Sequence, residues 1–228
     1  MPAAPTVRPV DAAGLVLIRQ GTGAPEVLMG RRHRGHSFLP NIYVFPGGRL
    51  DAGDNQPSGF PEPVPGDTLR ELRRGAGRRT PLAFARAALR ETLEETGLLV
   101  GQPGHGAGGG TRQEPWRHFA RRGLAPAFAA LGFVCRAITP TSSARRYNTR
   151  FLVVDGALAG GDLAGDGELE DLAWRNADAL RHLGLVDVTA FVLEEALACW
   201  HNPQKVPPPA LLSYRSDVVR LRRSRPTG

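Results

Sequence analysis

Apolar residues along the chain form short runs that are typical of strands, together with a few longer stretches that have helical spacing. The short runs are rich in Val, Ile, Leu, Tyr or Phe and are bounded by Gly, Pro or polar residues, as strands are. They are Ala12–Arg19, Glu26–Arg32, Asn41–Phe45, Gly132–Thr139, Tyr147–Asp155 and Leu169–Trp174. Strands mixed with a few helices predict a layered fold of the α/β or α+β class.

The clearest helix is Pro81–Thr96, because the residues at both of its ends suit their positions. Thr80 suits the N-cap, Pro81 the first turn, and Gly97 the left-handed position after the last turn. An apolar stripe along this helix can face a core, and it consists of Leu82, Ala85, Leu89 and Leu93. Two further helices are predicted, at Val188–His201 and around Thr68–Arg74.

Two segments interrupt this pattern. Residues 51–80 are rich in Gly, Pro and Arg and show little periodicity, so we expect an irregular insertion inside a single domain of residues 1–228. Residues 101–112 contain the run GHGAGGG, and we expect this loop to be mobile. No internal repeat is apparent, so the sequence does not indicate a solenoid or a propeller.

The helix at Pro81–Thr96 carries three glutamates near its end, Glu91, Glu94 and Glu95. They project from one face because a helical turn takes about 3.6 residues. Like charges at this spacing repel one another, and the last turn already presents negative potential. Arg90 alone cannot neutralise three carboxylates, whereas a divalent cation with oxygen ligands can. The alternative interpretation is a solvated acidic helix face.

Charge and composition narrow the class of partner. The chain has 29 Lys and Arg against 22 Asp and Glu, and Lys205 is its only lysine. Arginine suits bidentate contact with phosphate, although a coding bias toward arginine would give the same excess. No apolar run reaches the roughly 20 residues of a membrane span and no leader is apparent, so we expect a cytoplasmic protein. Cys135 and Cys199 lie far apart in apolar settings and are expected to be buried thiols.

The run Phe45-Pro46-Gly47-Gly48 follows a predicted strand directly, and paired glycines let a backbone approach a metal or a phosphate closely. Together with RETLEETGL on the following helix, this run resembles the signature of the Nudix hydrolases, G-x5-E-x7-R-E-U-x-E-E-x-G-U, in which U is apolar. The second half of the signature is matched by Arg90, Glu91, Glu94, Glu95, Gly97 and Leu98. The resemblance implies an α/β/α sandwich with a mixed central sheet.

The first half of the signature departs from the family pattern. Gly48 and Arg90 are 42 positions apart instead of 14, so about 28 residues are inserted inside this signature, which is called the Nudix box. Leu82 stands where the family has a loop glutamate, and Asp54 is the candidate for that carboxylate from before the insertion. The interrupted Nudix box and the sequence segments SFLPNIYVFPGGRLD and ITPTSSARRYNTRFL resemble those of the branch of Nudix enzymes that includes coenzyme A diphosphatases.

The resemblance implies a metal site at the end of this helix. It implies Mg²⁺ or Mn²⁺ bound by Glu94, Glu95 and the Gly47 carbonyl. Glu91 would be a further ligand or the base toward a bridging water, and Arg90 would orient the carboxylates by hydrogen bonds. Family members often recruit one more acidic residue from a loop, for which the candidates are Glu168 and Glu170.

The resemblance also implies cationic contacts with the substrate phosphates. The candidates are Arg145, Arg146, Arg150 and the Gly48 backbone. Alternation along a strand predicts Arg146 and Arg150 on one face and Arg145 on the other, and only one face can meet the ligand. We expect Arg146 and Arg150 to be on that face. We also expect Phe151 to belong to the core.

The substrate stays open between coenzyme A or acyl-coenzyme A and other nucleotide derivatives, namely nucleoside diphosphate sugars, NADH and nucleoside triphosphates. The box sets the chemistry, whereas distant loops choose the substrate. A non-catalytic nucleic-acid-binding or regulatory protein on the same fold is suggested by the pI of about 10.5 and the arginine runs at 70–79 and 220–225. The retained carboxylates argue against that class. The oligomeric state stays open between a monomer and a homodimer.

Overall fold

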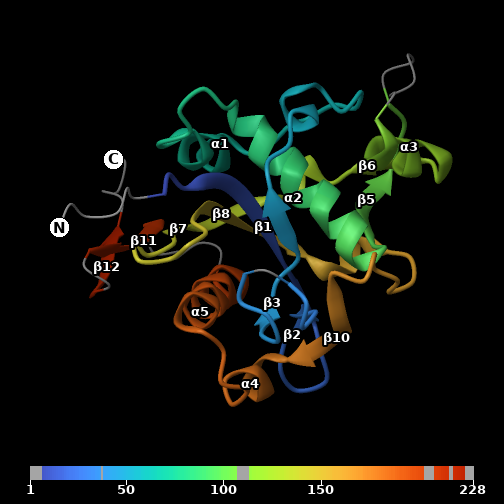
Figure 1. The fold of residues 1–228 in the computed structure, drawn as a ribbon. Coiled ribbons are helices and arrows are strands. Elements are labelled where there is room, and N and C mark those ends of the chain that lie inside the picture. The colour runs from blue at the N-terminus through green and yellow to red at the C-terminus, as the bar shows by residue number, and fades with distance from the viewer. Residues whose placement is uncertain (1–6, 37, 107–112, 203–207, 216–217, 224–228) are drawn as a thin grey trace.

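The computed structural model describes residues 7–36, 38–106, 113–202, 208–215 and 218–223 (Figure 1). The large sheet has the strand order β10-β2-β1-β8-β7-β11-β12, with β3 added beside β2 and β4 beside β1. Its strands are β1 (Val10–Arg19), β2 (Glu26–Arg32), β3 (Tyr43–Val44), β4 (Gly47–Arg49), β7 (Gly132–Ile138), β8 (Tyr147–Asp155), β10 (Leu169–Asn176), β11 (Ala210–Arg215) and β12 (Val218–Arg223). A small sheet contains β5 (Leu99–Pro103), β6 (Leu124–Pro126) and β9 (Ala159–Gly160). The helices are α1 (Gly66–Arg73), α2 (Pro81–Thr96), α3 (Glu114–Arg121), α4 (Ala177–Leu180) and α5 (Asp187–His201).

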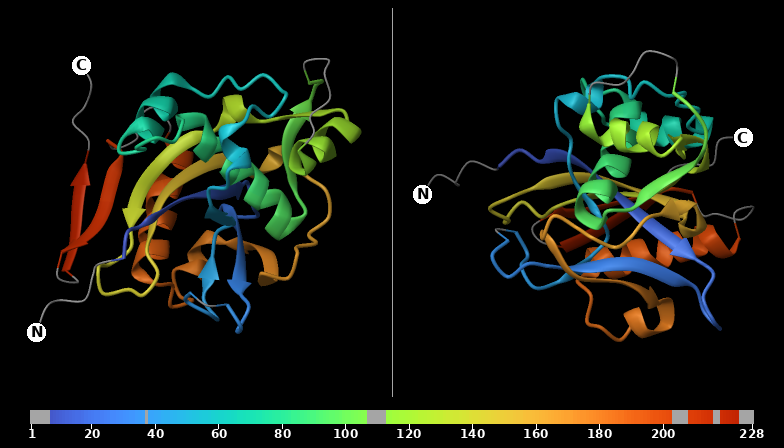
Figure 2. Two further views of the ribbon diagram at one scale, coloured as in Figure 1. Left: turned by 45° about the horizontal axis from the view of Figure 1, so that its top comes forward. Right: turned by 90° about the vertical axis from the view of Figure 1, so that its right-hand side faces the viewer.

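Helices cover both faces of the large sheet, with α2 on one face and α5 on the other (Figure 2). In β1, Leu15 and Leu17 pack with α2, whereas Val16 and Ile18 pack with α5. Successive side chains of a strand point to opposite faces, so a strand buried on both faces needs an unbroken apolar run. β1 pairs parallel with β8 and antiparallel with β2. The fold is therefore an α/β/α sandwich with a mixed central sheet, as the resemblance implied.

The helix predicted at Pro81–Thr96 is confirmed as α2, with the predicted caps. Thr80 Oγ1 accepts a hydrogen bond from the Ala83 N–H at 3.2 Å, and Gly97 ends the helix in the left-handed conformation with φ of 74°. Ala85 and Leu89 are fully buried in the core, and the other two residues of the predicted stripe pack against it. The sequence therefore predicted both ends of this helix and its buried face.

The strand predicted at Asn41–Phe45 is shorter in the structure, and a further strand follows it. Proline has no N–H to donate to a ladder, so Pro46 separates β3 from β4. β4 then pairs antiparallel with β1, and Gly47 adopts a φ of 152° there. A side chain at Gly47 would collide with the carbonyl oxygen of Ala13, so this close crossing of two strands requires glycine.

Residues 51–80 contribute to the core instead of lying loosely on the surface. Phe60, Val64 and Leu72 are buried in the same cluster as the inner face of α2. The predicted short helix is present as α1, whose Thr68 hydroxyl donates to the Leu131 carbonyl at 3.0 Å. This segment therefore packs against the buried face of α2 and forms part of the core.

Several short elements were not predicted from the sequence. They are β5, α3 and β6 between residues 99 and 126, and the C-terminal hairpin β11–β12. Gly101–Pro103 belongs to β5, while residues 107–112 of the loop expected to be mobile lie outside the described residues. Cys135 is buried and Cys199 is half-buried, and both thiols are free. No helix in the described ranges is long and apolar enough to span a lipid bilayer.

Candidate active site

A cleft of about 760 Å³ opens where the C-terminal end of α2 meets β1, β4 and β8. Glu91, Glu94 and Glu95 make part of its lining acidic. Another part is apolar and aromatic, and it includes Phe38, Leu39, Ile42, Phe45, Tyr147, Phe151, Val188 and Tyr214. The cleft therefore combines a carboxylate cluster with a surface that suits a large, partly apolar group.

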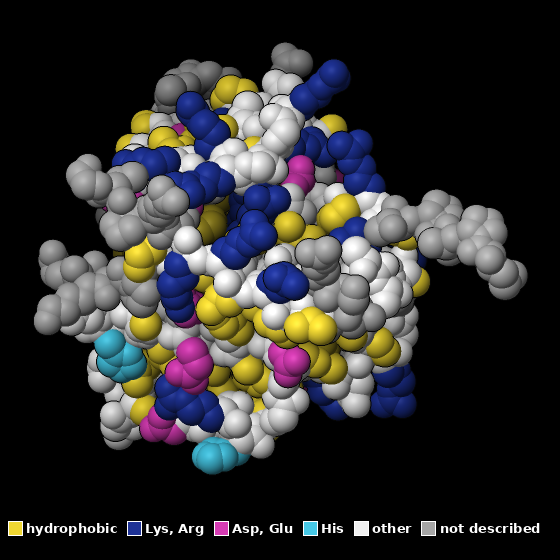
Figure 3. Space-filling view, turned by 90° about the vertical axis from the view of Figure 1, so that its left-hand side faces the viewer, with side chains coloured by type: hydrophobic (Ala, Val, Ile, Leu, Met, Phe, Trp, Pro, Cys, Tyr) yellow, Lys and Arg dark blue, Asp and Glu magenta, His cyan; other side chains and the backbone are white. Residues whose placement is uncertain are grey.

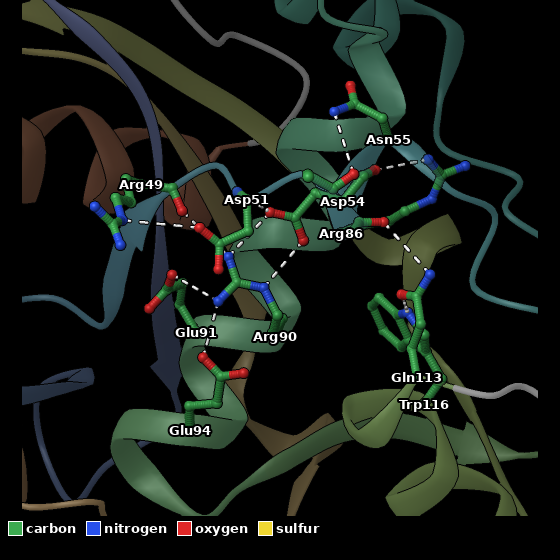
Figure 4. A network of polar contacts seen from close by, with 12 residues as sticks. Arg49, Asp51, Asp54, Asn55, Arg86, Arg90, Glu91, Glu94, Gln113 and Trp116 are labelled. Atoms are coloured by element: carbon green, nitrogen blue, oxygen red, sulfur yellow. Dashed lines mark hydrogen bonds and ion pairs between the residues drawn. The ribbon is translucent and has the colours of Figure 1, made fainter.

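Arg90 connects the carboxylates at this site (Figure 4). Its Nε and Nη2 donate to the two oxygens of Asp54, each at 3.0 Å, and its Nη1 donates to Glu91 at 2.7 Å and to Glu94 at 2.8 Å. Burial disfavours the charged guanidinium, yet the bonds to Asp54 and the nearby carboxylates hold the pKa of Arg90 above its ordinary value. Arg90 thus orients Glu91 and Glu94 and stays a permanent cation between them.

Asp54 lies beside Arg90 although it is 36 positions away in the sequence. Its side chain is only 2% exposed, and one of its oxygens also accepts from the Asp51 N–H at 2.7 Å. Bidentate hydrogen bonding from Arg90 satisfies its buried charge. The structure therefore brings the candidate carboxylate from before the insertion into the network of the helix glutamates.

Glu95 and Glu91 are buried carboxylates without full compensation by cations. Burial raises the pKa of Glu95 to about 8, against the opposing effect of the Gly47 N–H, which donates to Glu95 at 2.7 Å. Burial likewise raises the pKa of Glu91 to about 7, against the opposing charge of Arg90. Both shifts show that the ionised site is costly without a further positive charge.

The paired glycines serve close packing around these carboxylates. A Cβ at Gly48 would lie 2.6 Å from the carboxyl carbon of Glu91, so glycine is needed for β4 to pass α2 at this point. Gly47 presents its N–H to Glu95. The Gly47 N–H, and not its carbonyl, contacts Glu95, so the expected role of the carbonyl as a metal ligand stays a prediction.

The carboxylates of Glu91, Glu94 and Glu95 are not arranged as a metal-binding site in this conformation. Among the residues that the structure describes, no three His, Cys, Asp or Glu side chains are arranged to hold a metal ion. Arg90 occupies one oxygen of Glu91 and one of Glu94 in this arrangement. Binding a cation would therefore require the outer oxygens of these side chains to turn toward Glu95.

The substrate-binding arginines predicted on β8 need correction. Tyr147, Thr149 and Phe151 line the cleft, and Phe151 also packs against the core as expected. Alternation then turns Arg150 to the opposite face, where it is fully buried. Arg150 donates to the carbonyls of Leu72 and Arg74, each at 3.0 Å, and stacks on Phe84 with 3.8 Å between the guanidinium carbon and the ring centroid.

The remaining two arginines of this segment also exchange their expected roles. Arg146 donates to the carbonyls of Thr139 and Val7 and does not line the cleft. Arg145 is exposed and lines it. The sequence predicted the alternation correctly but chose the wrong face, because periodicity does not show which side of a sheet carries the site.

The two acidic loop candidates differ in their surroundings, because Glu168 lies in the bend before β10 and Glu170 lies within the strand. Glu168 lines the cleft and lies near enough to Glu95 for their charges to interact. Glu170 instead forms ion pairs with Arg31 at 3.4 Å and with His33 at 3.6 Å, outside the cleft lining. Of the two, only Glu168 is placed to act on a ligand in the cleft.

Sequence reasoning missed Arg32, at the end of β2, and the aromatic pair Phe38 and Tyr147. All three line the cleft. The signal in the sequence is the stretch GRRHRGHSF directly before the third predicted strand, in which cations and an aromatic residue lead toward FPGG. Only the pairing of β2 with β1 shows that Arg32 is on the same side as the α2 glutamates.

Comparison with known proteins agrees with this geometry. No protein-family profile and no curated protein sequence matches the chain. A Nudix hydrolase from Alicyclobacillus acidocaldarius is 28% identical, with a TM-score of 0.63 over 85% of this chain and 93% of that chain. The chain has the Nudix hydrolase fold. A MutT protein from Bacillus halodurans, 12% identical with a TM-score of 0.50 over 93% of this chain and 97% of that chain, shares the fold.

The fold shared with Nudix hydrolases and the side chains of the cleft point to the same class of enzyme. The Alicyclobacillus Nudix hydrolase matches nearly its whole length, and the second half of the Nudix box is present on α2 beside the cleft. Together these observations support a hydrolase with the Nudix fold.

Proposed function

We propose that this Nudix protein is a divalent-metal-dependent diphosphatase whose substrate is coenzyme A or acyl-coenzyme A. The observation that carries the proposal is the cluster of Glu91, Glu94 and Glu95 on the wall of a cleft that also has a broad apolar and aromatic lining. Such a cleft suits a molecule that joins a charged diphosphate to a large, less polar group.

The residues of the cluster fit a divalent cation. Carboxylate oxygens are the ligands that Mg²⁺ and Mn²⁺ prefer. Glu95 is buried and Glu91 is half-buried, and burial raises the pKa of both, so a cation beside them would favour their ionised form. Glu94, Glu95 and Glu91 would hold the cation, and the Gly47 carbonyl is a further candidate. When bound, such a metal lowers the pKa of a water and neutralises the diphosphate oxygens.

The reaction breaks one bond of the diphosphate bridge. The oxygen of a water bonds to one phosphorus, the bridging oxygen leaves with the other phosphate, and the proton of the water goes to a carboxylate of the protein. Glu91 and Glu168 are the candidate bases, since both line the cleft. Arg90 keeps Glu91 and Glu94 in place through its hydrogen bonds. The reaction consumes one water and releases two phosphate esters.

The preference for coenzyme A has three supports. The interrupted box and its neighbouring words resemble the coenzyme A diphosphatase branch. The cleft has a long apolar lining that suits a pantetheine or acyl chain. Arg145, exposed at the cleft, can meet the 3′-phosphate that distinguishes coenzyme A from NADH and ADP-ribose.

A panel of substrates tests this proposal. Coenzyme A, acyl-coenzyme A, NADH, ADP-ribose and deoxynucleoside triphosphates would be incubated with Mg²⁺ or Mn²⁺, and the products identified by mass. We expect coenzyme A to yield a phosphopantetheine and 3′,5′-ADP faster than the other compounds react. Faster turnover of ADP-ribose or NADH would contradict the substrate assignment, and turnover of none with either metal would contradict the diphosphatase.

A further inference from the structure

Four arginines line the described part of the cleft, but only one of them is both inside it and free of carboxylate partners. They are Arg32, Arg49, Arg90 and Arg145. All donor nitrogens of Arg90 are engaged by Asp54, Glu91, Glu94 and the Arg49 carbonyl. Arg49, which pairs with Asp51, and Arg145 are exposed. Arg32 is half-buried, and no carboxylate in the described ranges forms an ion pair with it.

Arg32 is held in one orientation by Phe38. Its Nη1 donates to the Phe38 carbonyl at 3.0 Å, and its guanidinium carbon lies 5.5 Å from the centroid of the Phe38 ring. The Phe38 ring in turn packs edge-on against Tyr147, with 5.1 Å between the ring centroids. Nε and Nη2 have no hydrogen-bond partner among the described residues. A planar cation is therefore fixed on one side, with two donor nitrogens left over.

Arg32 also lies beside the metal-binding carboxylates without contacting them. The charges of Glu95 and Glu168 act on Arg32 from across the cleft. A half-buried cation that faces carboxylates and lacks an ion pair is not explained by packing alone, because burial without a partner is costly. A group that carries negative charge and fits between Arg32 and the carboxylate-bound metal would satisfy both sides.

We propose that Arg32 binds the diphosphate of the substrate, with Phe38 as the residue that positions it. This inference rests on the proposed diphosphatase function and specifies its phosphate site. A phosphate oxygen accepts from Nε and Nη2, the two donors that the protein leaves unused. The less polar part of the substrate then extends along Phe38 and Tyr147. Substrates with a group attached to the diphosphate are bound more tightly than inorganic pyrophosphate.

Binding of ADP and of inorganic pyrophosphate in the presence of Mg²⁺ tests the assignment directly. Arg32→Met should weaken the binding of both compounds by about tenfold or more, because a charged hydrogen bond is lost. Arg32→Lys should restore part of the loss, since it keeps the charge without the planar pair of donors. Phe38→Leu should have a smaller effect of the same kind. Arg49→Met, an exposed arginine of the same cleft, is the matched control and should change binding less than twofold.

A second measurement separates a phosphate contact from a structural role. Thermal stabilisation by Mn²⁺ alone should persist in Arg32→Met, because the substitution removes a positive charge near the carboxylates and takes away no ligand. Loss of that stabilisation, or unchanged affinity for ADP and pyrophosphate, would overturn the assignment. If Arg32→Met weakens ADP binding while the wild-type protein hydrolyses no diphosphate, the Arg32 site stands and the proposed function falls.

Discussion

At the scale of single residues, the site contains more carboxylates than cations to neutralise them. Arg90 serves Asp54, Glu91 and Glu94 at once, while Glu95 has only the Gly47 N–H. Removing either kind of partner leaves a buried charge, which costs more than the contact itself contributes. A bound cation would therefore favour the ionised form of the carboxylates nearest the cleft.

Replacement of the helix glutamates should separate activity from stability. Glu94→Gln and Glu95→Gln are each expected to lower kcat by about 100-fold or more, because each would remove a charged ligand of the proposed metal. The melting temperature of the metal-free protein should hold or rise, most of all for Glu95→Gln, whose ionised form is buried. Glu170→Gln is the matched control, since Glu170 lies outside the cleft lining. Near-normal kcat in either variant at saturating metal would remove that glutamate from the site.

A second buried ion pair, Arg86 with Glu62, should make stability depend on acid pH. Burial raises the pKa of Glu62, but hydrogen bonds from Arg86 and Ser58 outweigh burial and hold it below its ordinary value. A carboxylate with a lowered folded pKa adds stability above its unfolded pKa, and this contribution is lost as pH falls through the folded value. Glu62→Gln should therefore cost about 3 kcal/mol of unfolding free energy at neutral pH.

The difference in unfolding free energy between Glu62→Gln and wild type should shrink as the pH of urea unfolding falls below 4.5, the ordinary pKa of a glutamate. Glu114→Gln is the control, because Glu114 belongs to an exposed ion pair with Arg117. A loss of stability that is the same at every pH would show that packing, and not the charge of Glu62, is responsible.

At the scale of elements, the close approach of β4 to α2 shapes the site. Gly48→Ala would place a methyl group 2.6 Å from the Glu91 carboxyl carbon, so the flexible carboxylate must move. We expect kcat to fall by about 100-fold, as small misplacements of catalytic groups do, with little change in melting temperature. Gly66→Ala should leave both unchanged, because no atom lies within 4 Å of its added Cβ. Normal kcat in Gly48→Ala would show that Glu91 needs no fixed position.

Alternation along β8 and the residues just before it places Arg150 in the core and Arg145 at the cleft. Arg150→Met should lower the free energy of unfolding by about 3 kcal/mol, because the Leu72 and Arg74 carbonyls lose their donor. Its KM should change little. Arg145→Ala should instead leave stability unchanged and raise KM for coenzyme A more than KM for dephospho-coenzyme A, by about tenfold if one charged hydrogen bond is lost. Equal effects of Arg145→Ala on both compounds would deny the 3′-phosphate contact.

At the scale of the whole molecule, the arginine excess is partly unrelated to the cleft. Exposed arginines of α1 and β12 include Arg70, Arg73, Arg220 and Arg222, and Figure 3 shows Lys and Arg side chains gathered on one face of the protein. Such a surface attracts any polyanion weakly and in a salt-dependent way. It does not explain the carboxylate cluster, so any affinity for nucleic acid would be a general property of the surface charge.

Metal binding should stabilise the whole fold, because the unfolded chain has no comparable site. A ligand that binds only the folded protein adds about 2.7 kcal/mol at 100 times its dissociation constant. Millimolar Mn²⁺ or Mg²⁺ should therefore raise the melting temperature by several degrees. Glu91→Gln should reduce this increase, and Glu170→Gln should not. A melting temperature that is indifferent to both metals would count against a metal site.

The sequence by itself determined α2, its caps, its buried face and its carboxylate cluster. Helix ends and helical periodicity depend on residues at most a few positions apart, so Thr80, Gly97 and the spacing of Glu91, Glu94 and Glu95 were sufficient. The apolar strands β1, β2, β7 and β8 were predicted for a similar local reason. The family signature on α2 then pointed to the sandwich and to hydrolysis of a diphosphate.

Only the tertiary structure decided which side chains share the cleft. Asp54 reaches Arg90 across the insertion, Arg32 joins the glutamates through the pairing of β2 with β1, and Arg150 turns away from them. These relations join residues far apart along the chain, and alternation in a strand is the same whichever face meets the site. Local pattern therefore determined the chemistry that the chain carries, while non-local packing determined which charges meet the ligand.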